Sequence, residues 1–96
     1  MNDNHHSNIL DIKNYRISFI ESFDTHDIEL QNKLINATND INLQSIRIHK
    51  FITHNGSIGK VSFARFLSTI NLDEQTRIME LNITSIEDIV TFIENL

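Results

Sequence analysis

An apolar stripe at helical spacing runs through the last residues of the chain, and it limits the possible folds more than any other feature. Its members lie three or four residues apart: Ile86, Ile89, Val90, Ile93 and Leu96. This spacing is typical of one buried face of an amphipathic helix. Thr84 followed three residues later by Glu87 forms a capping-box pattern. The sequence therefore predicts a helix over residues 85–95.

A second stripe predicts another helix, over residues 63–70. Its apolar residues again fall three and four apart: Phe63, Phe66, Leu67 and Ile70. Ser62 stands at the position of an N-cap, and Val61 is placed to pack against Phe66 as a hydrophobic staple.

A short helix over residues 73–81 is predicted between these two. Asn71 can cap its start, and the acidic Asp73 lies in the first turn, where the helix dipole favours negative charge. Asn82 is expected to end it in the left-handed conformation.

The stretch 26–53 carries a similar stripe with a weak centre. Its apolar positions are Leu30, Leu34, Ala37, Ile41, Ile48 and Ile52. Residues 38–42 include Thr38, Asn39, Asp40 and Asn42, which are poor helix formers. We therefore predict two helices with a break between them.

Two segments leave strands open as an alternative. Asn55-Gly56 is a strong hairpin signal that would pair residues 46–54 with residues 57–65. Near the N-terminus, the apolar residues between Ile12 and Phe23 fit a helix and a strand equally well. We predict an all-α, single-domain bundle of four to six short helices over residues 9–96, after a disordered tail over residues 1–8. The alternative is an α+β fold of the order β-α-β-β-α.

Composition excludes several classes of protein. The chain has 96 residues and no cysteine, so disulfides, thiol catalysis and thiolate metal sites are excluded. No apolar run reaches the length of a signal peptide core or a membrane span, so we expect no membrane association. A cytoplasmic location is the default expectation.

Charge is unevenly distributed along the chain. Residues 1–40 hold three basic and seven acidic residues, residues 41–72 hold four basic and no acidic residues, and residues 73–96 hold one basic and six acidic residues. The basic residues of the middle third are Arg47, Lys50, Lys60 and Arg65. A cationic stretch in an acidic protein is the natural place for an anionic partner to bind. We predict a partner-binding surface made by these four residues, with Phe51 as an aromatic hot spot.

The run Gly59-Lys60-Val61-Ser62-Phe63-Ala64-Arg65-Phe66-Leu67 resembles the end of an EF-hand calcium loop and the start of its exiting helix. Calcium requires several oxygen ligands, usually with a closing Glu, and this window has no acidic residue and places Arg65 at the closing position. The resemblance implies a metal-free helix-loop-helix, and in the EF-hand family such helices commonly bind peptides.

A helix-turn-helix is a further alternative. The helix over residues 63–70 would precede a recognition helix over residues 73–81, while the basic segment 41–72 would contact phosphates. Asp73 and Glu74 oppose this reading, because carboxylates at the start of a recognition helix repel phosphate and base acceptors.

No pattern of catalytic or metal-ligating residues is found. His49 and His54 are five residues apart, which separates them on a helix and on a strand. Ser57 lies near His54, but no acidic residue of the same stretch could orient that histidine. We therefore expect no enzyme, no cofactor and no metal.

The function predicted from the sequence is a non-catalytic protein-interaction or regulatory module, of the inhibitor, immunity or adaptor type. Its expected partner is a protein. A nucleic-acid-binding regulator and a metal-free EF-hand-like peptide binder are the alternatives. The sequence does not predict the oligomeric state.

Overall fold

The structure, a computed structural model, describes the backbone of residues 3–96 and the side chains of residues 10–96. Within this part of the chain, the elements in order are α1 (Asp3–Glu21), α2 (Leu30–Thr38), α3 (Ile48–Thr53), α4 (Lys60–Thr69), the 3-10 helix η1 (Ile78–Glu80) and α5 (Ile83–Glu94). The described residues contain no strand beyond one isolated β-bridge. The all-α prediction is confirmed, and the α+β alternative is wrong.

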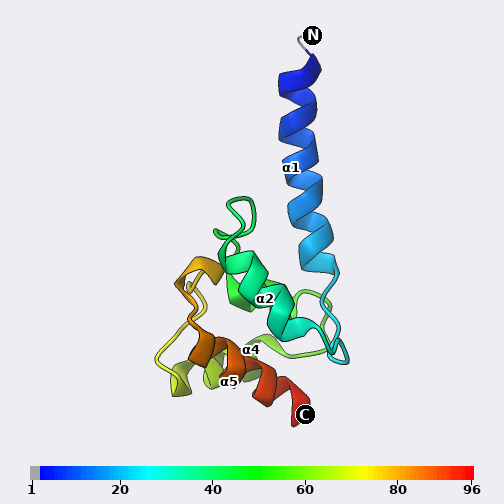
Figure 1. Cartoon of the computed structure of the whole chain (residues 1–96). Helices are drawn as coiled ribbons and strands as arrows, with labels where there is room; N and C mark the ends of the chain where they lie inside the picture. Colours follow the sequence, from blue (N-terminus) through cyan, green and yellow to red (C-terminus); the bar gives the residue numbers. More distant parts are fainter. Residues whose placement is uncertain (1–2) are drawn as a thin grey trace.

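Four of the α-helices and η1 form a small body from which α1 projects (Figure 1). Within this body α2 packs against α5 and η1, and α3 packs against α4. The C-terminal end of α1 packs against α3, while its other end extends away from the body. The molecule consequently measures 50 × 23 × 23 Å along its principal axes.

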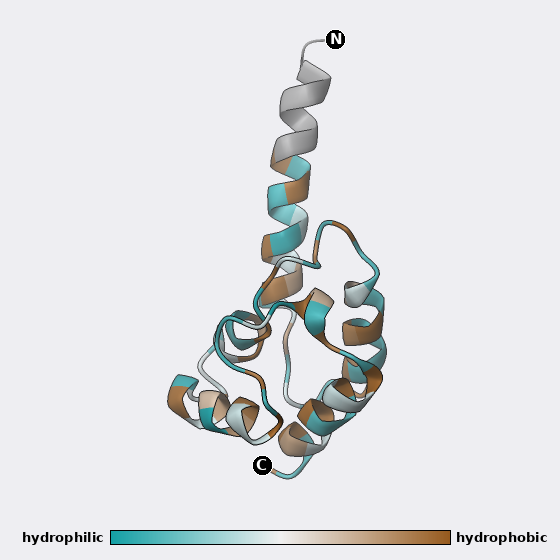
Figure 2. Cartoon of the chain, turned by 90° about the vertical axis from the view of Figure 1, so that its left-hand side faces the viewer, coloured by the Kyte–Doolittle hydropathy of each residue, from teal (hydrophilic) through white to brown (hydrophobic). Residues whose placement is uncertain are grey.

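The core lies between the helices of the body. Its largest fully buried side chains are Leu34, Ile48, Phe51, Ile52, Phe63, Leu67, Ile78, Ile86 and Ile89. Burying one such aliphatic or aromatic side chain contributes about 1.5–3 kcal/mol relative to leaving it exposed. In Figure 2 apolar and polar segments alternate along the helices, as expected when one face of each helix contributes to this core.

The predicted C-terminal helix is present as α5, but it is capped by a different residue. The side chain of Asn82 accepts a hydrogen bond from the Ser85 N–H (2.8 Å), and the Ser85 hydroxyl accepts one from the Asn82 N–H (2.9 Å). This reciprocal pair places the cap at Asn82, two residues before the predicted cap at Thr84, and the helix begins at Ile83. The prediction that Asn82 ends a helix was therefore wrong, because it begins one.

The helix predicted over residues 63–70 is present as α4 and begins three residues earlier. Gly59, not Ser62, is its N-cap, and Val61 is largely exposed and not buried as a staple would be. At the other end, Asn71 adopts the left-handed conformation (φ 62°) instead of capping a new helix. The N–H groups of Asn71 and Leu72 bond back to the Ser68 and Leu67 carbonyls (3.2 and 2.9 Å), which is the Schellman pattern.

The helix predicted over residues 73–81 is reduced to η1. The Asp73 carboxylate accepts a hydrogen bond from the Gln75 N–H (2.8 Å), and the Thr76 hydroxyl accepts one from the Asp73 N–H (3.1 Å). Such local side-chain bonds favour a turn over the first turn of a helix. The following residues pair with the segment before α3, which fixes them in an extended conformation.

The break predicted within residues 26–53 is confirmed, since α2 and α3 are separate helices. The alternative of a hairpin at Asn55-Gly56 is wrong: Gly56 makes a turn with φ 80°, but helices flank it on both sides. The Asn55 amide instead joins this turn to the segment that follows α1, because it donates to the Phe23 carbonyl (3.0 Å). For residues 12–23 the sequence allowed a helix or a strand, and the structure has a helix as far as Glu21.

The disordered tail predicted for residues 1–8 stays a prediction. Residues 1–2 lie outside the described residues, and no side chain is described before Leu10.

Candidate basic binding surface

A surface hollow of about 270 Å³ gathers cationic side chains from distant parts of the chain. It is lined by Arg16, Arg47, Lys50 and Arg77, with Ile20, Ser45 and Ile46 beside them. We call the surface formed by Arg16, Arg47, Lys50 and Arg77 the basic hollow. Arg16 comes from α1, Lys50 from α3, and the two other arginines from the segments before α3 and η1.

Arg47 and Arg77 face each other across the isolated antiparallel bridge. The bonds that flank them join the Ile48 N–H to the Thr76 carbonyl (3.0 Å) and the Ile78 N–H to the Ile46 carbonyl (2.9 Å). The two arginines are thus a non-hydrogen-bonded pair, in which Cα atoms are only about 4.5 Å apart and both side chains leave the same face.

Burial explains why both arginines point outward. Ile46 and Ile48 are buried on either side of Arg47, and Thr76 and Ile78 are buried on either side of Arg77. Because side chains of an extended segment alternate between two faces, burying the neighbours turns each arginine toward solvent. Two like charges placed directly opposite each other in this way are destabilising.

Arg16 closes the hollow from the side of α1. Its Nη1 donates to the Asn42 carbonyl (2.7 Å) and to the Ser45 hydroxyl (2.9 Å), which ties α1 to the loop before α3. The other nitrogens of this guanidinium make no hydrogen bond within the described part of the chain. The side chain is half-buried, so its position is fixed more firmly than that of a solvated arginine.

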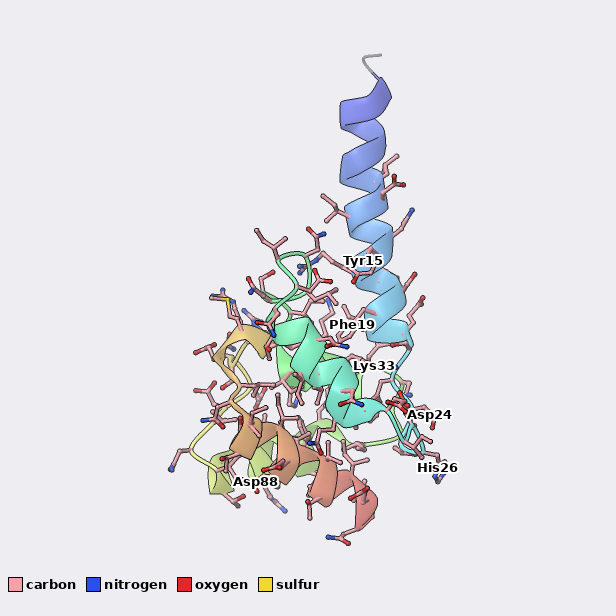
Figure 3. The ribbon with its side chains drawn as sticks, viewed as in Figure 1. Tyr15, Phe19, Asp24, His26, Lys33 and Asp88 are labelled. Carbon is pink, nitrogen blue, oxygen red and sulfur yellow. The ribbon has the colours of Figure 1, made fainter. Side chains whose placement is uncertain are left out.

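The loop between α2 and α3 is held in place on both sides of Arg16. The Tyr15 hydroxyl donates to Asp40 (2.5 Å), and this hydrogen bond raises the pKa of Tyr15. Figure 3 shows Tyr15 and Phe19 on α1, and the Phe19 ring stacks on Phe51 of α3 with centroids 4.5 Å apart. The Gln44 carbonyl accepts from the Met79 N–H (3.0 Å), which joins this loop to η1.

The cations of the basic hollow have no acidic partner in the described residues. The one ion pair found there joins Lys33 to Asp27 (2.8 Å), at the opposite end of α2 from the loop that leads to α3. The hydrogen bond from Lys33 lowers the pKa of Asp27. The nearby Glu80 carboxylate accepts a hydrogen bond from the Arg77 backbone N–H (2.7 Å) and does not line the hollow. Four positive charges therefore converge without internal neutralisation.

A second hollow, of about 420 Å³, continues the surface past Lys50. Its lining consists of His49, Lys50, Thr53, His54, Lys60 and Glu74. His49 Nε2 lies 2.9 Å from the Lys60 carbonyl oxygen, which requires the ring to donate from Nε2 and connects α3 to the start of α4. Glu74 makes this second hollow less positive than the first.

The structure brings together part of the surface predicted from the sequence. Arg47 and Lys50 lie in the basic hollow, and Lys60 shares the second hollow with Lys50. Arg65 is exposed but lines neither hollow, and it lies about 140° around α4 from Lys60. The prediction that Phe51 is an aromatic hot spot was wrong, because none of its side chain is exposed.

Arg16 and Arg77 were missed because they lie in the acidic thirds of the sequence. A usable signal existed for Arg77: Ile46-Arg47-Ile48 and Thr76-Arg77-Ile78 share the same alternation of β-branched and basic residues. This alternation is typical of short paired extended segments. Arg16 carries no such signal, because only the docking of α1 brings it to the hollow.

Among the side chains of residues 10–96, no group of three or more histidines and carboxylates is arranged to hold a metal ion. None of the described helices combines the length and apolar character needed to cross a bilayer.

Comparison of the chain with models of protein families, with curated proteins and with solved structures gives no match in any of the three.

Proposed function

We propose that this protein is a non-catalytic interaction module, of the inhibitor, immunity or adaptor type, that binds an acidic surface of a partner protein through the basic hollow. The observation that carries the proposal is the Arg47–Arg77 pair, in which two like charges are held face to face by a β-bridge. An arrangement that destabilises the free protein is understandable if an anionic partner neutralises it.

The surroundings of the pair support binding through this surface. The bridge fixes the backbone that carries Arg47 and Arg77, and the bonds from Arg16 to the loop before α3 fix the Arg16 side chain itself. A side chain held as Arg16 is loses less conformational entropy on binding than a mobile surface lysine does. The acidic thirds of the chain help to select a partner, because like-charge contact outside the hollow disfavours other surfaces.

The proposal is tested by capture from a lysate of the source cell with the full tagged chain, run once with nuclease and once without it. We expect one protein to be retained in stoichiometric amount by the natural chain and lost when Arg47→Glu and Lys50→Glu are combined. Both side chains are exposed, so the double variant is expected to fold. Arg65→Glu is the matched control, because it reverses an exposed arginine outside the hollow.

Two outcomes would contradict the proposal. If the double variant still retains every protein that the natural chain captures, the basic hollow is not the binding surface. Recovery of nucleic acid alone, lost on nuclease treatment, would favour the nucleic-acid-binding alternative, although the recognition helix that it requires is absent from residues 73–77.

A further inference from the structure

We propose that the basic hollow is a phosphoryl-binding site that accepts a phosphorylated side chain of the partner protein. The inference rests on the proposed function and adds the chemical group that the partner would present. It comes from the number of cations, their geometry, and the size and surroundings of the hollow.

The number of cations favours a doubly charged group. Arg16, Arg47, Lys50 and Arg77 bring four positive charges to one hollow, and none of them forms an ion pair within the described residues. A single carboxylate would neutralise one of these charges. A phosphoryl ester carries about −1.5 to −2 at pH 7 and offers three acceptor oxygens, so it satisfies several cations at once.

The kind of cation favours phosphate as well. Three of the four side chains are arginines, whose planar guanidinium groups bind phosphate oxygens through two parallel hydrogen bonds. Arg47 and Arg77 leave the same face of a β-bridge, so one tetrahedral anion lying between them can accept from both. Lys50 adds a point charge from α3 at the same hollow.

The size of the hollow favours a side chain over a larger ligand. At about 270 Å³ it is smaller than the roughly 300–1,000 Å³ of pockets that enclose small molecules and cofactors. Its wall includes the aliphatic Ile20 and Ile46, which are buried, together with the hydroxyl of Ser45. This provides room for one phosphoryl group and the carbon atoms that carry it.

The surroundings disfavour a long polyanion. The chain has a net charge of −5, and Glu74 and Glu80 are exposed on either side of the segment that holds Arg77. Glu74 lines the second hollow, which shares Lys50 with the basic hollow. A nucleic-acid backbone continuing through that second hollow would meet this carboxylate, whereas a single phosphorylated residue held in the basic hollow would not.

The test uses the full 15N-labelled chain in low salt and follows its backbone amide and arginine Nε–H signals by NMR. The probes are a short uncharged peptide with one phosphoserine, the same peptide with serine, inorganic phosphate, and a single-stranded oligonucleotide. We expect the phosphopeptide and inorganic phosphate to shift the signals of Arg47 and Arg77, and the serine peptide to shift neither.

Variants identify the site. Loss of a charged hydrogen bond corresponds to about a tenfold or greater weakening, so Arg47→Gln and Arg77→Gln should each weaken phosphopeptide binding by at least about tenfold. Arg65→Gln should leave it unchanged. Each variant's amide spectrum also reports whether the fold is retained, so a folding defect is not mistaken for a lost ligand.

Three results would overturn the inference. The first is no shift at Arg47 or Arg77 with either phosphate probe, and the second is equal weakening by Arg65→Gln. The third is an oligonucleotide that binds more tightly than the phosphopeptide with a steep dependence on salt, since that indicates several phosphate contacts. If phosphate fails while capture of an acidic partner still depends on Arg47 and Lys50, the inference falls and the proposed function stands.

Discussion

Helices α5 and α1 both carry apolar residues at close intervals, but these side chains are buried in α5 and largely exposed in α1. In α5 the stripe Ile86, Ile89 and Ile93 is at most 4% exposed. In α1 the residues Leu10, Ile12, Tyr15 and Ile17 are 42–46% exposed, and only the C-terminal end packs on the body. The contrast teaches that an apolar pattern can form a helix without deciding whether the helix is covered.

Aromatic rings join the C-terminal end of α1 to the core. Phe51 of α3 stacks against Phe19 (4.5 Å between centroids) and meets Phe23 edge to face (5.3 Å). Phe51 itself belongs to the core, so these rings connect the exposed helix α1 to the buried interior of the body.

The largest effect is expected for Phe51→Ala. Removal of this ring takes away a core side chain and the docking surface of α1, which should lower the free energy of unfolding by about 3–5 kcal/mol. Urea denaturation followed by circular dichroism measures it. A loss of no more than about 0.5 kcal/mol, the range of ordinary surface substitutions, would contradict the burial of this ring between α1 and the core.

The two helices are compared directly by truncating one isoleucine in each. Ile89→Ala in α5 leaves a cavity in the core and should cost about 2–5 kcal/mol. Ile12→Ala in α1 is the matched control and should change stability by no more than about 0.5 kcal/mol. Equal losses in the two variants, measured by the same denaturation, would show that the outer part of α1 is covered in solution.

A smaller effect is expected at the start of α5. Asn82→Ala removes the side-chain oxygen that accepts from the Ser85 N–H, and loss of such a cap costs about 0.5–2 kcal/mol. Asn82→Asp is the conservative variant and should retain most of the stability. If the alanine variant matches the natural chain in thermal unfolding, the cap at Thr84 expected from the sequence becomes the better description.

The smallest effect concerns the contact between α1 and the loop before α3. Tyr15 is the sole tyrosine, so its ionisation can be followed by ultraviolet absorbance. The hydrogen bond to Asp40 should hold its pKa above the usual value of about 10. Asp40→Asn should lower this pKa, and the control Asp24→Asn should not.

The sign of the associated stability effect follows from linkage. A group whose pKa is raised by folding contributes stability that is fully present below the unfolded pKa and is lost as the pH rises through the folded pKa. The Tyr15–Asp40 contact should therefore stabilise the protein at neutral pH and weaken in alkali. A Tyr15 pKa that does not respond to Asp40→Asn would contradict the contact.

The spacing of apolar residues was sufficient to predict the main helices of the body. The stripes at residues 63–70 and 86–96 and the polar break near residue 40 gave the helical class and the separation of α2 from α3, because a core-facing helix must place apolar side chains at intervals near 3.6 residues. The caps were less predictable: Asn82 and Asn71 exchanged their expected roles, since asparagine suits both an N-cap and the left-handed conformation.

The candidate site depended much more on tertiary structure. The sequence by itself determined a helical protein with a basic middle third, including Arg47 and Lys50. Only the fold decided that Phe51 is buried, that Arg65 lies apart, and that Arg16 and Arg77 join the hollow. The physical reason is that a binding surface consists of side chains brought together by a β-bridge and a docked helix, and these contacts join residues about 30 positions apart, beyond the reach of any local pattern.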